Sequence, residues 1–467
     1  MTPPDAPRPD AAHPDAAHPD TAHRGTTSAE TTPTPSAAPV VAYPGTVVQA
    51  RIDTRAITHN AATIAARVAP ATLLSVVKAD AYGHGLATVV DACRAAGVAD
   101  FGVATVPEAL QLAALLGADP EARNERILCW LYDDRTDLTA CARAGIELGV
   151  STAGALHQVI RAAQASGRTV RVHLKIDTGL GRNGFTPEAF TAFLPELAAA
   201  AERAAGAVEV VGIMTHLANA DVVGDPETGS QLAILDRVRA QLLTVLESAG
   251  GTLGDPAALL VHAANSPAAL SLDPVPGGLA RVGLSTYGLS PFEGRTAAEL
   301  GLRPAMTLVS RVLAVKEVPA GHGASYGLTY TCAEPTRFAL VAGGYADGIP
   351  RSASNRAQVS IRGRRYPVVG RVAMDQMILD IGPVPGIVEV GDEVVIIGDG
   401  STGPSAEEWA AWADTVNYEI VTRIGPRVER VVIGAGHDAT SAVRQGGIPS
   451  SAVAGVDDRF RGRGHRG

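Results

Sequence analysis

The feature that most constrains the fold of this chain is an alternation of short apolar runs with alanine-rich amphipathic stretches between residues 73 and 283. This pattern is typical of βα units around a buried parallel sheet. The eight apolar runs are Leu73–Val77, Phe101–Val106, Ile127–Tyr132, Ile146–Ser151, Val170–Ile176, Val208–Thr215, Leu259–His262 and Leu279–Gly283. The clearest helices are predicted at Leu86–Ala96, Pro107–Leu116, Ala153–Ala165 and Gln231–Ala249. Eight units in this length favour a closed (β/α)8 barrel of the TIM type over an open sheet.

The pattern changes after about residue 292, where strands joined by Gly and Pro predominate. Runs such as MTLVSRVLAVKEV and GDEVVIIG predict a mostly β domain. One helix interrupts it at Glu407–Val416, with Ser405 as its expected N-cap. We therefore predict an α/β protein whose barrel covers residues 45–291 and whose mostly β C-terminal domain covers residues 292–435.

The segments that flank these domains, residues 1–44 and 436–467, differ from them in composition. The first is rich in Pro, Ala and His, with a near repeat of AAHPD, and the second is rich in Gly, Ser and Arg. Such segments lack the apolar residues that a packed core needs. We predict a disordered leader and a flexible tail.

The charge of the whole chain argues against several classes of partner. Its 467 residues include 39 Lys+Arg and 48 Asp+Glu, a formal net charge of −9, with 4% aromatic residues. Nucleic acid requires a basic surface with stacking residues, which this balance does not provide. No apolar stretch reaches the roughly 18 residues of a membrane span, and the N-terminus lacks the basic start and apolar core of a signal peptide. We expect a soluble, cytoplasmic protein that binds neither nucleic acid nor membrane.

The four cysteines, Cys93, Cys129, Cys141 and Cys332, lie far apart and form no C-x-x-C pair. A chain of this size does not depend on disulfides for its stability. We expect buried, reduced thiols and no metal site.

Lysine is rare in this chain: it occurs at Lys78, Lys175 and Lys316, and the other 36 basic residues are arginine. Arginine does not lose its proton near neutral pH, whereas lysine can form an imine or be carbamylated. Lys316 lies in an alternating run and is expected on the solvent side of a strand. Lys78 and Lys175 are therefore the candidates for chemistry.

Polar side chains follow the apolar runs at their carboxyl ends, where the active sites of (β/α)8 barrels lie. They are Lys78, then Lys175 with Asp177 and Arg182, then His216, then Asn265 with Ser266, and finally Arg281. Each has a purely structural alternative, such as a core histidine at 216, a helix cap at 265 and 266, or an ion pair between Lys175 and Asp177. Gathered at one face, they favour a catalytic site.

The cofactor is suggested by the seventh and eighth runs. Ser266 and the glycine of R-V-G-L occupy the place where barrels commonly bind phosphate. A lysine that can form an imine beside a phosphate site suggests pyridoxal phosphate. The competing motif, Gly179–Gly184, fits G-x-G-x-x-G, but the helix signal begins beyond it at Thr186. A dinucleotide fold needs the helix to open within the glycines, so NAD is disfavoured.

Longer blocks resemble the motifs of the alanine racemase family, in the same order and over about residues 45–435. V-V-K-A-D-A-Y-G-H-G (76–85) is similar to the cofactor-lysine signature of that family. Further blocks are H-L-K-I-D-T-G-L-G-R-N-G (173–184), T-H-L-A-N-A-D (215–221), H-A-A-N-S (262–266), R-V-G-L-S-T-Y-G-L (281–289), S-Y-G-L-T-Y (325–330), G-Y-A-D-G (344–348), G-R-V-A-M-D-Q (370–376) and N-Y-E (417–419). The resemblance implies a fold-type III pyridoxal phosphate enzyme, a homodimer in which each β domain completes the partner's active site.

The resemblance also assigns roles around the cofactor. Lys78 would hold pyridoxal phosphate covalently. Its phosphate would be bound by Tyr82, Ser266, Gly283, Leu284 and Tyr418, with Asn265 in the same cofactor site. Arg281 would face the pyridine nitrogen, and His216 would support the ring.

On the substrate side, the resemblance implies that Arg182 binds the carboxylate. Lys175 resembles the carbamylated lysine that orients this arginine in the family. The partner subunit would supply Tyr326 as second acid/base, and Tyr345, Met374 and Asp375 would shape the pocket. Ala373 stands where many relatives carry Cys before Met-Asp-Gln, a departure that leaves no catalytic role vacant.

The implied reaction agrees with these residue types. Racemisation removes the α-proton from one face and returns a proton to the other, so it needs two bases on opposite sides. Lys78 would serve the D face and Tyr326 the L face, racemising alanine and supplying D-alanine for peptidoglycan. The alternatives are a broader-specificity racemase, another fold-type III enzyme such as a basic amino-acid decarboxylase, and a non-catalytic cofactor carrier. Arg281 argues against the decarboxylase, and the β domain argues against the carrier.

Overall fold

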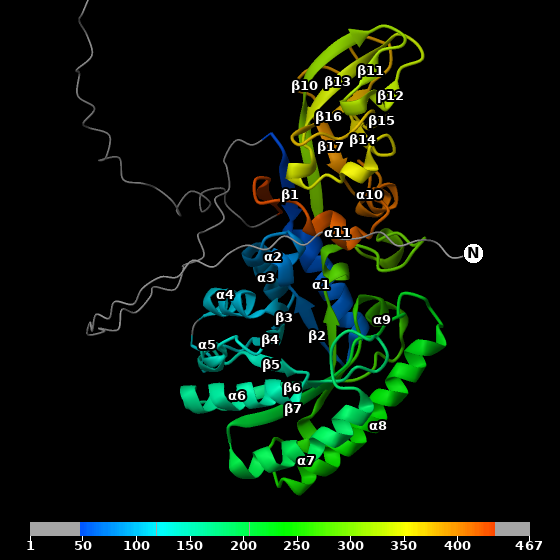
Figure 1. Cartoon of the computed structure of the whole chain (residues 1–467). Helices are drawn as coiled ribbons and strands as arrows, with labels where there is room; N and C mark the ends of the chain where they lie inside the picture. Colours follow the sequence, from blue (N-terminus) through cyan, green and yellow to red (C-terminus); the bar gives the residue numbers. More distant parts are fainter. Residues whose placement is uncertain (1–46, 118, 205, 435–467) are drawn as a thin grey trace, which may run out of the picture. The chain divides into compact units, whose positions relative to one another are not determined.

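The computed structural model describes residues 47–117, 119–204 and 206–434. The predicted leader and tail lie outside these residues and stay predictions. Within the described part of the chain, two eight-stranded sheets account for most of the strands, and a two-stranded ribbon completes them. The first sheet lies among the helices of the barrel, and the second belongs mostly to the C-terminal residues (Figure 1).

The barrel sheet is parallel, in the order β9-β2-β3-β4-β5-β6-β7-β8. Its strands are β2 (Thr72–Val76), β3 (Asp100–Thr105), β4 (Arg126–Leu131), β5 (Glu147–Val150), β6 (Val170–Lys175), β7 (Val208–Met214), β8 (Leu260–His262) and β9 (Leu279–Val282). All eight predicted strands are confirmed, each end within one residue. The backbone N–H groups of Gly278 and Arg281 donate to the carbonyls of Val261 and Ala264, so β9 returns to β8 and the barrel is nearly closed.

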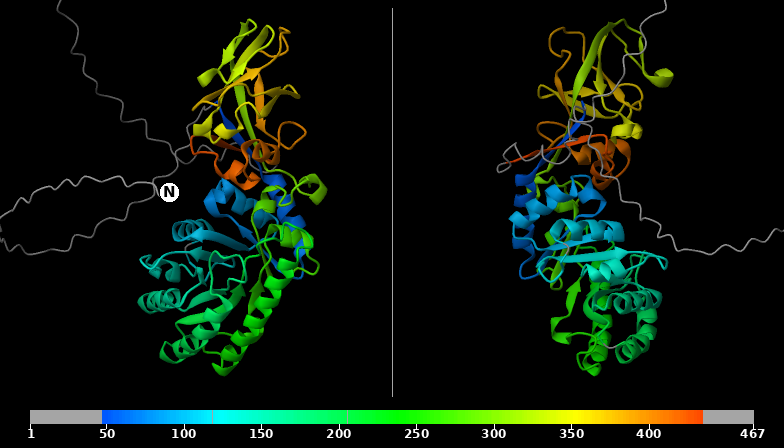
Figure 2. Two further views of the ribbon diagram at one scale, coloured as in Figure 1. Left: turned by 45° about the vertical axis from the view of Figure 1, so that its right-hand side comes forward. Right: turned by 90° about the vertical axis from the view of Figure 1, so that its left-hand side faces the viewer.

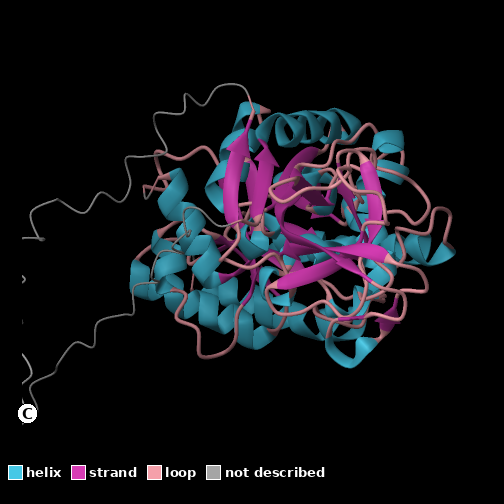
Figure 3. Ribbon diagram, turned by 90° about the horizontal axis from the view of Figure 1, so that it is seen from above, coloured by secondary structure: helices cyan, strands magenta, loops and turns pink. Residues whose placement is uncertain are grey.

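Helices lie beside the strands of this sheet (Figure 1), and the view from above looks onto the second sheet first (Figure 3). They are α1 (Thr54–Val68), α2 (Lys78–Tyr82), α3 (Leu86–Ala95), α4 (Val106–Leu116), α5 (Thr139–Arg143), α6 (Ala153–Ser166), α7 (Pro187–Arg203), α8 (Pro226–Ser248) and α9 (Ser266–Ser271). The four predicted helices are present. The last of them, α8, begins five residues earlier than predicted, because Asp225 caps it and Pro226 takes its first position.

The second sheet has the order β15-β14-β17-β10-β1-β18, with β13 pairing with β10 and β16. Its strands are β1 (Gln49–Asp53), β10 (Met306–Val318), β13 (Thr336–Ala342), β14 (Gln358–Ile361), β15 (Arg364–Pro367), β16 (Gln376–Asp380), β17 (Glu393–Ile397) and β18 (Glu429–Ile433). The ribbon is β11 (Gly323–Ala324) with β12 (Tyr330–Thr331), and the helices here are α10 (Ala406–Ala413) and α11 (Asn417–Thr422).

One strand differs from the sequence-based organisation. We placed residues from 45 onward in the barrel, but β1 pairs antiparallel with β10 and parallel with β18. Figures 1 and 2 show this blue strand among the strands of the second sheet. Its burial alternates along QARID, the pattern of a strand with one buried face, whereas barrel strands are buried almost throughout. The chain therefore begins in the second sheet before it enters the barrel.

Local signals in the second domain are otherwise read correctly. Ser405 caps α10 in a capping box with Glu408, as predicted for the cap. The helix ends three residues early, because Asp414 adopts a left-handed conformation with φ 54°. Lys316 is exposed on β10, and the four cysteines are buried and unpaired, as expected.

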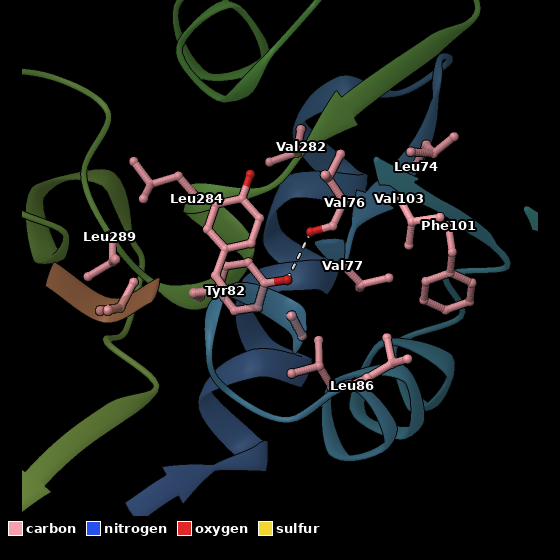
Figure 4. Packing of buried hydrophobic residues seen from close by; sticks show 14 of the residues in the cluster. Leu74, Val76, Val77, Tyr82, Leu86, Phe101, Val103, Val282, Leu284 and Leu289 are labelled. Atoms are coloured by element: carbon pink, nitrogen blue, oxygen red, sulfur yellow. Dashed lines mark hydrogen bonds between the residues drawn. The ribbon is translucent and has the colours of Figure 1, made fainter. Parts of the chain in front are cut away.

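The core continues from the barrel to the turn that carries the candidate lysine. Figure 4 shows Tyr82 packed among Val76, Val282 and Leu284. The hydroxyl of the fully buried Tyr287 donates to the Val76 carbonyl at 2.8 Å. This bond ties the end of β2 to the segment after β9, which places the first and last barrel strands in fixed register beside the cavity described below. Among the described helices, none has the length and apolarity to cross a membrane.

Candidate active site

A cavity of about 1140 Å³ opens at the carboxyl ends of the barrel strands. The predicted site residues that line it are Lys78, Tyr82, Lys175, Arg182, His216, Asn265, Ser266, Arg281, Gly283, Leu284 and Tyr418. They come from segments that end β2, β6, β7, β8 and β9, and from α11. The structure thus brings together residues that are spread over 340 positions of sequence, from Lys78 to Tyr418.

The backbone after Lys78 follows an uncommon path. Ala79, Asp80, Ala81 and Tyr82 have φ values of 54°, 51°, 52° and 55°, so α2 is a left-handed turn made of non-glycine residues. Left-handed conformation costs such residues about 1–2 kcal/mol each. The turn leads Tyr82 into the cavity, where its ring lies 4.7 Å from that of Tyr287 and 6.3 Å from that of Tyr418.

Two side chains that sequence reasoning missed hold this turn. Glu108 accepts the Ala79 N–H at 2.7 Å, and the same carboxylate accepts the N–H groups of Ala104 and Thr105. Arg430 donates to the carbonyl of Gly83 at 3.1 Å. The capping box formed by Thr105 and Glu108 was readable as T-x-x-E, but its contact with the lysine turn was not.

Several of the residues predicted to bind phosphate lie close to Gly283 and line the cavity. A Cβ atom at this position would lie 2.3 Å from the Tyr82 hydroxyl, so only glycine leaves room there. The Ser285 N–H points to the Ser266 Oγ at 3.5 Å, and the hydroxyls of Ser285 and Thr286 are buried without a hydrogen-bond partner in the described chain. Orphaned donors in a buried pocket are the groups that an anion with several oxygens can satisfy.

Asn265 has the structural role that we weighed for it. Its side chain caps α9 by accepting the Ala268 N–H at 3.2 Å, while the residue also lines the cavity. Ser266 follows as the first residue of α9 and is almost fully buried. The cap therefore fixes the position at which Ser266 faces the cavity.

Arg281 is a buried guanidinium held on three sides. It donates to the His262 Nδ1 at 3.0 Å, to the His262 carbonyl at 2.7 Å and to the Thr215 carbonyl at 2.6 Å. Burial lowers the pKa of Arg281 to about 10, so the group stays a cation at neutral pH. Burial and the Arg281 charge together lower the pKa of His216 to about 3, which makes His216 a neutral ring beside this cation.

The two candidate lysines share one electrostatic environment. Burial and the Arg182 guanidinium lower the pKa of Lys78 below its ordinary value. Burial and the Arg281 charge lower the pKa of Lys175 to about 7, and its Nζ donates to the Ile176 carbonyl at 3.0 Å. Both amines therefore lose their protons more readily than exposed lysines do, as nucleophilic or carbamylated lysines must.

The alternative of an ion pair between Lys175 and Asp177 is not supported. The Asp177 carboxylate accepts the N–H groups of Gly179 and Gly181, each at 3.1 Å. This closes the glycine-rich loop onto itself, and Phe185 returns to pair with the end of β6. α7 opens at Pro187, with Thr186 as its cap, as the sequence indicates. No helix opens within the glycines, so the loop does not have the dinucleotide-binding form.

Four predicted site residues do not line this cavity and lie on the β domain instead. Tyr326 exposes 72% of its surface, Met374 52% and Tyr345 41%, and the Asp375 side chain is 62% exposed. Within one described chain these side chains are therefore open to solvent, away from the barrel cavity.

These four residues nevertheless share one surface. Backbone N–H groups of Tyr345 and Ala346 donate to the carbonyls of Ala373 and Met374 at 3.0 Å. Ser325, next to Tyr326, donates to the Arg371 carbonyl at 2.6 Å. We call this the 370–375 surface: the loop 370–375 with Tyr326 and Tyr345 beside it. Asp375 is anchored there by Arg427 at 2.8 Å.

Comparison with known proteins covers most of the described residues. The family model for the alanine racemase N-terminal domain matches residues 52–291, and that for the C-terminal domain matches residues 305–432. The alanine racemase of Beutenbergia cavernae is 44% identical over 85% of this chain and 100% of its own length, and that of Mycolicibacterium vanbaalenii is 42% identical over 84% and 96%.

Solved structures agree with the sequence relatives. Alanine racemase from a D-cycloserine-producing Streptomyces lavendulae has 43% identity and a TM-score of 0.76 over 84% of this chain and 98% of its own. Alanine racemase from Bartonella henselae, solved with covalently bound pyridoxal phosphate, has 28% identity and a TM-score of 0.72 over 83% and 100%. With both domains matched and the predicted cavity residues in one place, the chain belongs to the alanine racemase family.

Proposed function

We propose that this protein interconverts L-alanine and D-alanine with pyridoxal phosphate as cofactor, as a homodimer with shared active sites. The observation that carries the proposal is Lys78, an amine of lowered pKa that faces one cavity with the Arg281 cation and the Gly283 cradle. Family membership supports alanine as the substrate. We further propose that the activity serves the cytoplasmic supply of D-alanine for peptidoglycan.

The residues present fit the cofactor. Lys78 would bind it covalently, as supported by the cofactor bound in the Bartonella henselae relative. Tyr82, Ser266, Leu284 and the backbone at Gly283 would hold its phosphate, where buried hydroxyls lack partners. When bound, pyridoxal phosphate withdraws electrons from the amino acid and so acidifies the α C–H bond.

Two groups of the protein would move the α-proton. Lys78, whose pKa burial lowers, accepts or returns the proton on one face. Tyr326 of a second subunit would do so on the other face, since its side chain is exposed on the 370–375 surface and does not reach the cavity of its own chain. A dimer that places this surface over the partner's cavity completes the pair of bases.

Arg281 and His216 would support the cofactor ring without transferring protons. The Arg281 cation keeps its proton at neutral pH, so beside the ring nitrogen of the cofactor it would act as a hydrogen-bond donor and would not transfer its proton. The ring would then withdraw electrons only moderately, which would disfavour transamination as a side reaction. His216 stays neutral and packs as a polar ring beside it.

Arg182 would bind the substrate carboxylate at the open side of the cavity. Lys175, with a pKa of about 7, is largely neutral above that pH, and a neutral amine is the form that reacts with CO2. Once carbamylated, it becomes an anion next to Arg182 and orients the guanidinium.

The deciding experiment follows the circular-dichroism signal of L-alanine with purified protein and added pyridoxal phosphate, beside L-serine and L-lysine. We expect decay to a racemic mixture, fastest for alanine. Equal rates for all three amino acids would indicate a broader-specificity racemase. A stable optical signal from a protein that carries reducible cofactor would refute racemisation and favour a decarboxylase or a carrier.

A further inference from the structure

A chain of four buried polar side chains crosses the interior of the barrel behind Arg281. The Arg281 Nη1 lies 3.0 Å from the His262 Nδ1, the His262 Nε2 lies 2.9 Å from the His173 Nδ1, and the His173 Nε2 lies 2.7 Å from the Glu147 Oε2. All four are at most 8% exposed. They stand on β9, β8, β6 and β5, and Glu147 opens β5 at the end of the barrel opposite the cavity.

This line of hydrogen-bonded side chains is possible because β7 carries a glycine, Gly212, where the line crosses that strand. His173 on β6 must pass over β7 to reach His262 on β8, and Gly212 is its partner on β7 in the sheet. A Cβ atom at Gly212 would lie 2.2 Å from the His173 Nδ1. Because any other residue would block this path, the glycine keeps open a connection that bulky interior residues normally close.

The positions of the protons along these hydrogen bonds follow from the donor at one end, Arg281. A guanidinium donates and never accepts, so the His262 Nδ1 must accept from Arg281 and carries no proton. The proton of neutral His262 is then on Nε2, which donates to the His173 Nδ1. His173 in turn carries its proton on Nε2 and donates it to the Glu147 carboxylate. Every bond points from Arg281 towards Glu147, and each histidine has one allowed tautomer.

The charges at the far end support this order. The Glu147 carboxylate lies 3.0 Å from the Arg126 Nε and 2.9 Å from the Arg171 Nη2. Burial raises the pKa of Glu147, but the His173 hydrogen bond and the charges around the carboxylate outweigh burial and bring the pKa of Glu147 below its ordinary value. Burial and the Arg281 charge hold the pKa of His262 well below its usual range. The chain thus has a cation at one end, an anion at the other and two neutral rings between.

We propose that Glu147 is a positioning residue for the Arg281 guanidinium. Through His173 and His262, Glu147 imposes one order of protons on the hydrogen bonds. This order directs the remaining N–H groups of Arg281 into the cavity. Three of the five N–H donors of Arg281 are used by protein acceptors. The ring nitrogen of the bound cofactor would therefore meet a donor, Arg281, whose orientation depends on Glu147 through His262 and His173. The role at the ring rests on the proposed function, whereas the proton order does not.

The proton order is tested first on the unaltered, cofactor-free protein. Nitrogen-15 spectra of labelled histidine side chains, assigned with His173→Gln and His262→Gln variants, report which ring nitrogen is protonated. We expect both His173 and His262 to be neutral and protonated on Nε2. A proton on Nδ1 of either ring, or a doubly protonated ring, would overturn the inference whether or not the protein racemises alanine.

The effect on the site is tested with Glu147→Gln, because glutamine keeps the shape and an oxygen acceptor for His173 but removes the charge. Asp100→Asn is the matched control: Asp100 is also buried and pairs with Arg126 at 2.9 Å, but within the described residues it makes no hydrogen bond to His173 or His262. We expect Glu147→Gln to lower kcat about tenfold with KM for alanine nearly unchanged, the size typical of a side chain that acts through another.

A spectroscopic readout separates positioning from a loss of stability. Glu147→Gln should shift the absorbance of bound pyridoxal phosphate and the Nε2 signal of His173 in cofactor-free protein, while Asp100→Asn leaves both in place. Equal changes in kcat and absorbance for the two variants would refute the specific role of Glu147. If Glu147→Gln does not fold, the spectra of the unaltered protein still decide. Inactive wild-type protein with the expected tautomers would refute the proposed function but leave the proton order standing.

Discussion

The barrel and the β domain contribute to the proposed site in different ways. In the barrel, Lys78, His216 and Arg281 line one cavity and have lowered pKa values. On the β domain, Tyr326 and Met374 are largely exposed on the 370–375 surface. The barrel half is thus built by burial within one chain, whereas in the proposed homodimer the other half would act only in the cavity of a second copy. The predictions below test that contrast.

The largest effect is expected in the barrel, from Lys78→Ala. Removing the amine removes both the covalent anchor and one base, so racemisation should fall by about 10⁴-fold or more. Mass spectrometry after borohydride reduction checks for the covalent cofactor, which should be gone. A reducible adduct that survives denaturation in this variant would show that another lysine holds the cofactor, with Lys175 the first to examine.

On the β domain, Tyr326→Phe should lower racemisation by about 10²–10⁴-fold, because one acid/base group is lost. The covalent cofactor should remain, since Tyr326 does not line the barrel cavity. Exchange of the α-proton with deuterated water should persist for the enantiomer that Lys78 serves. Full racemase activity in this variant would refute the two-base assignment.

Mixing the two variants tests whether the halves come from different chains. In a hybrid dimer of Lys78→Ala with Tyr326→Phe, one site has both bases intact, so random pairing should restore about a quarter of wild-type activity. Lys78→Ala mixed with Arg281→Glu is the control, because both lesions then lie in the barrel and every hybrid site has one. Failure of the first mixture to exceed the second would argue for sites contained in single chains.

Lys175 offers a smaller effect that depends on pH. In CO2-free buffer the buried amine stays neutral until the pH falls to about 7, whereas in the unfolded chain it takes up its proton near 10.5. Between these values the unfolded state binds more protons, so the free energy of unfolding rises with pH. Relative to Lys175→Met, wild type should therefore lose stability as the pH is lowered from 10.5 to 7, with no further change below 7. Urea unfolding across this range measures the difference, and parallel curves would contradict the burial of this amine.

The smallest effect is expected from deleting residues 1–44. The family models match from residue 52 onward, and the described cavity is lined by residues within that region. We expect kcat/KM for alanine to stay within about twofold of the full chain, a change that surface truncations typically do not exceed. A larger fall would assign the segment a role that its composition does not suggest.

Sequence patterns predicted most of the barrel's strands and cavity residues, but little of how the site residues of the β domain are arranged. The eight strands followed from periodicity, because a buried parallel strand must be apolar throughout. All of the polar residues predicted at the ends of those strands except Asp177 line the same cavity, since parallel strands share one carboxyl edge. The residues of β1 were wrongly included in the barrel domain, because nothing in these five alternating residues indicates that they pair with β10.

The lysine turn shows where local reasoning stops. The run Ala79–Tyr82 contains no glycine and would ordinarily favour a right-handed helix. Its left-handed form is held by Glu108 and Arg430, which lie far away in sequence. Likewise, no pattern along the chain indicates that Tyr326 and Tyr345 flank the same loop.

The sequence by itself determined the eight strands of the barrel, the identity of the lysines available for chemistry and, through its motifs, the family. These depend on periodicity, composition and short blocks of residues, which are local properties. The tertiary structure alone decided the left-handed path after Lys78, the place of β1 and the line from Arg281 to Glu147 across Gly212. Each of these depends on contacts between distant segments, where one glycine or one carboxylate matters only because of what folding places beside it.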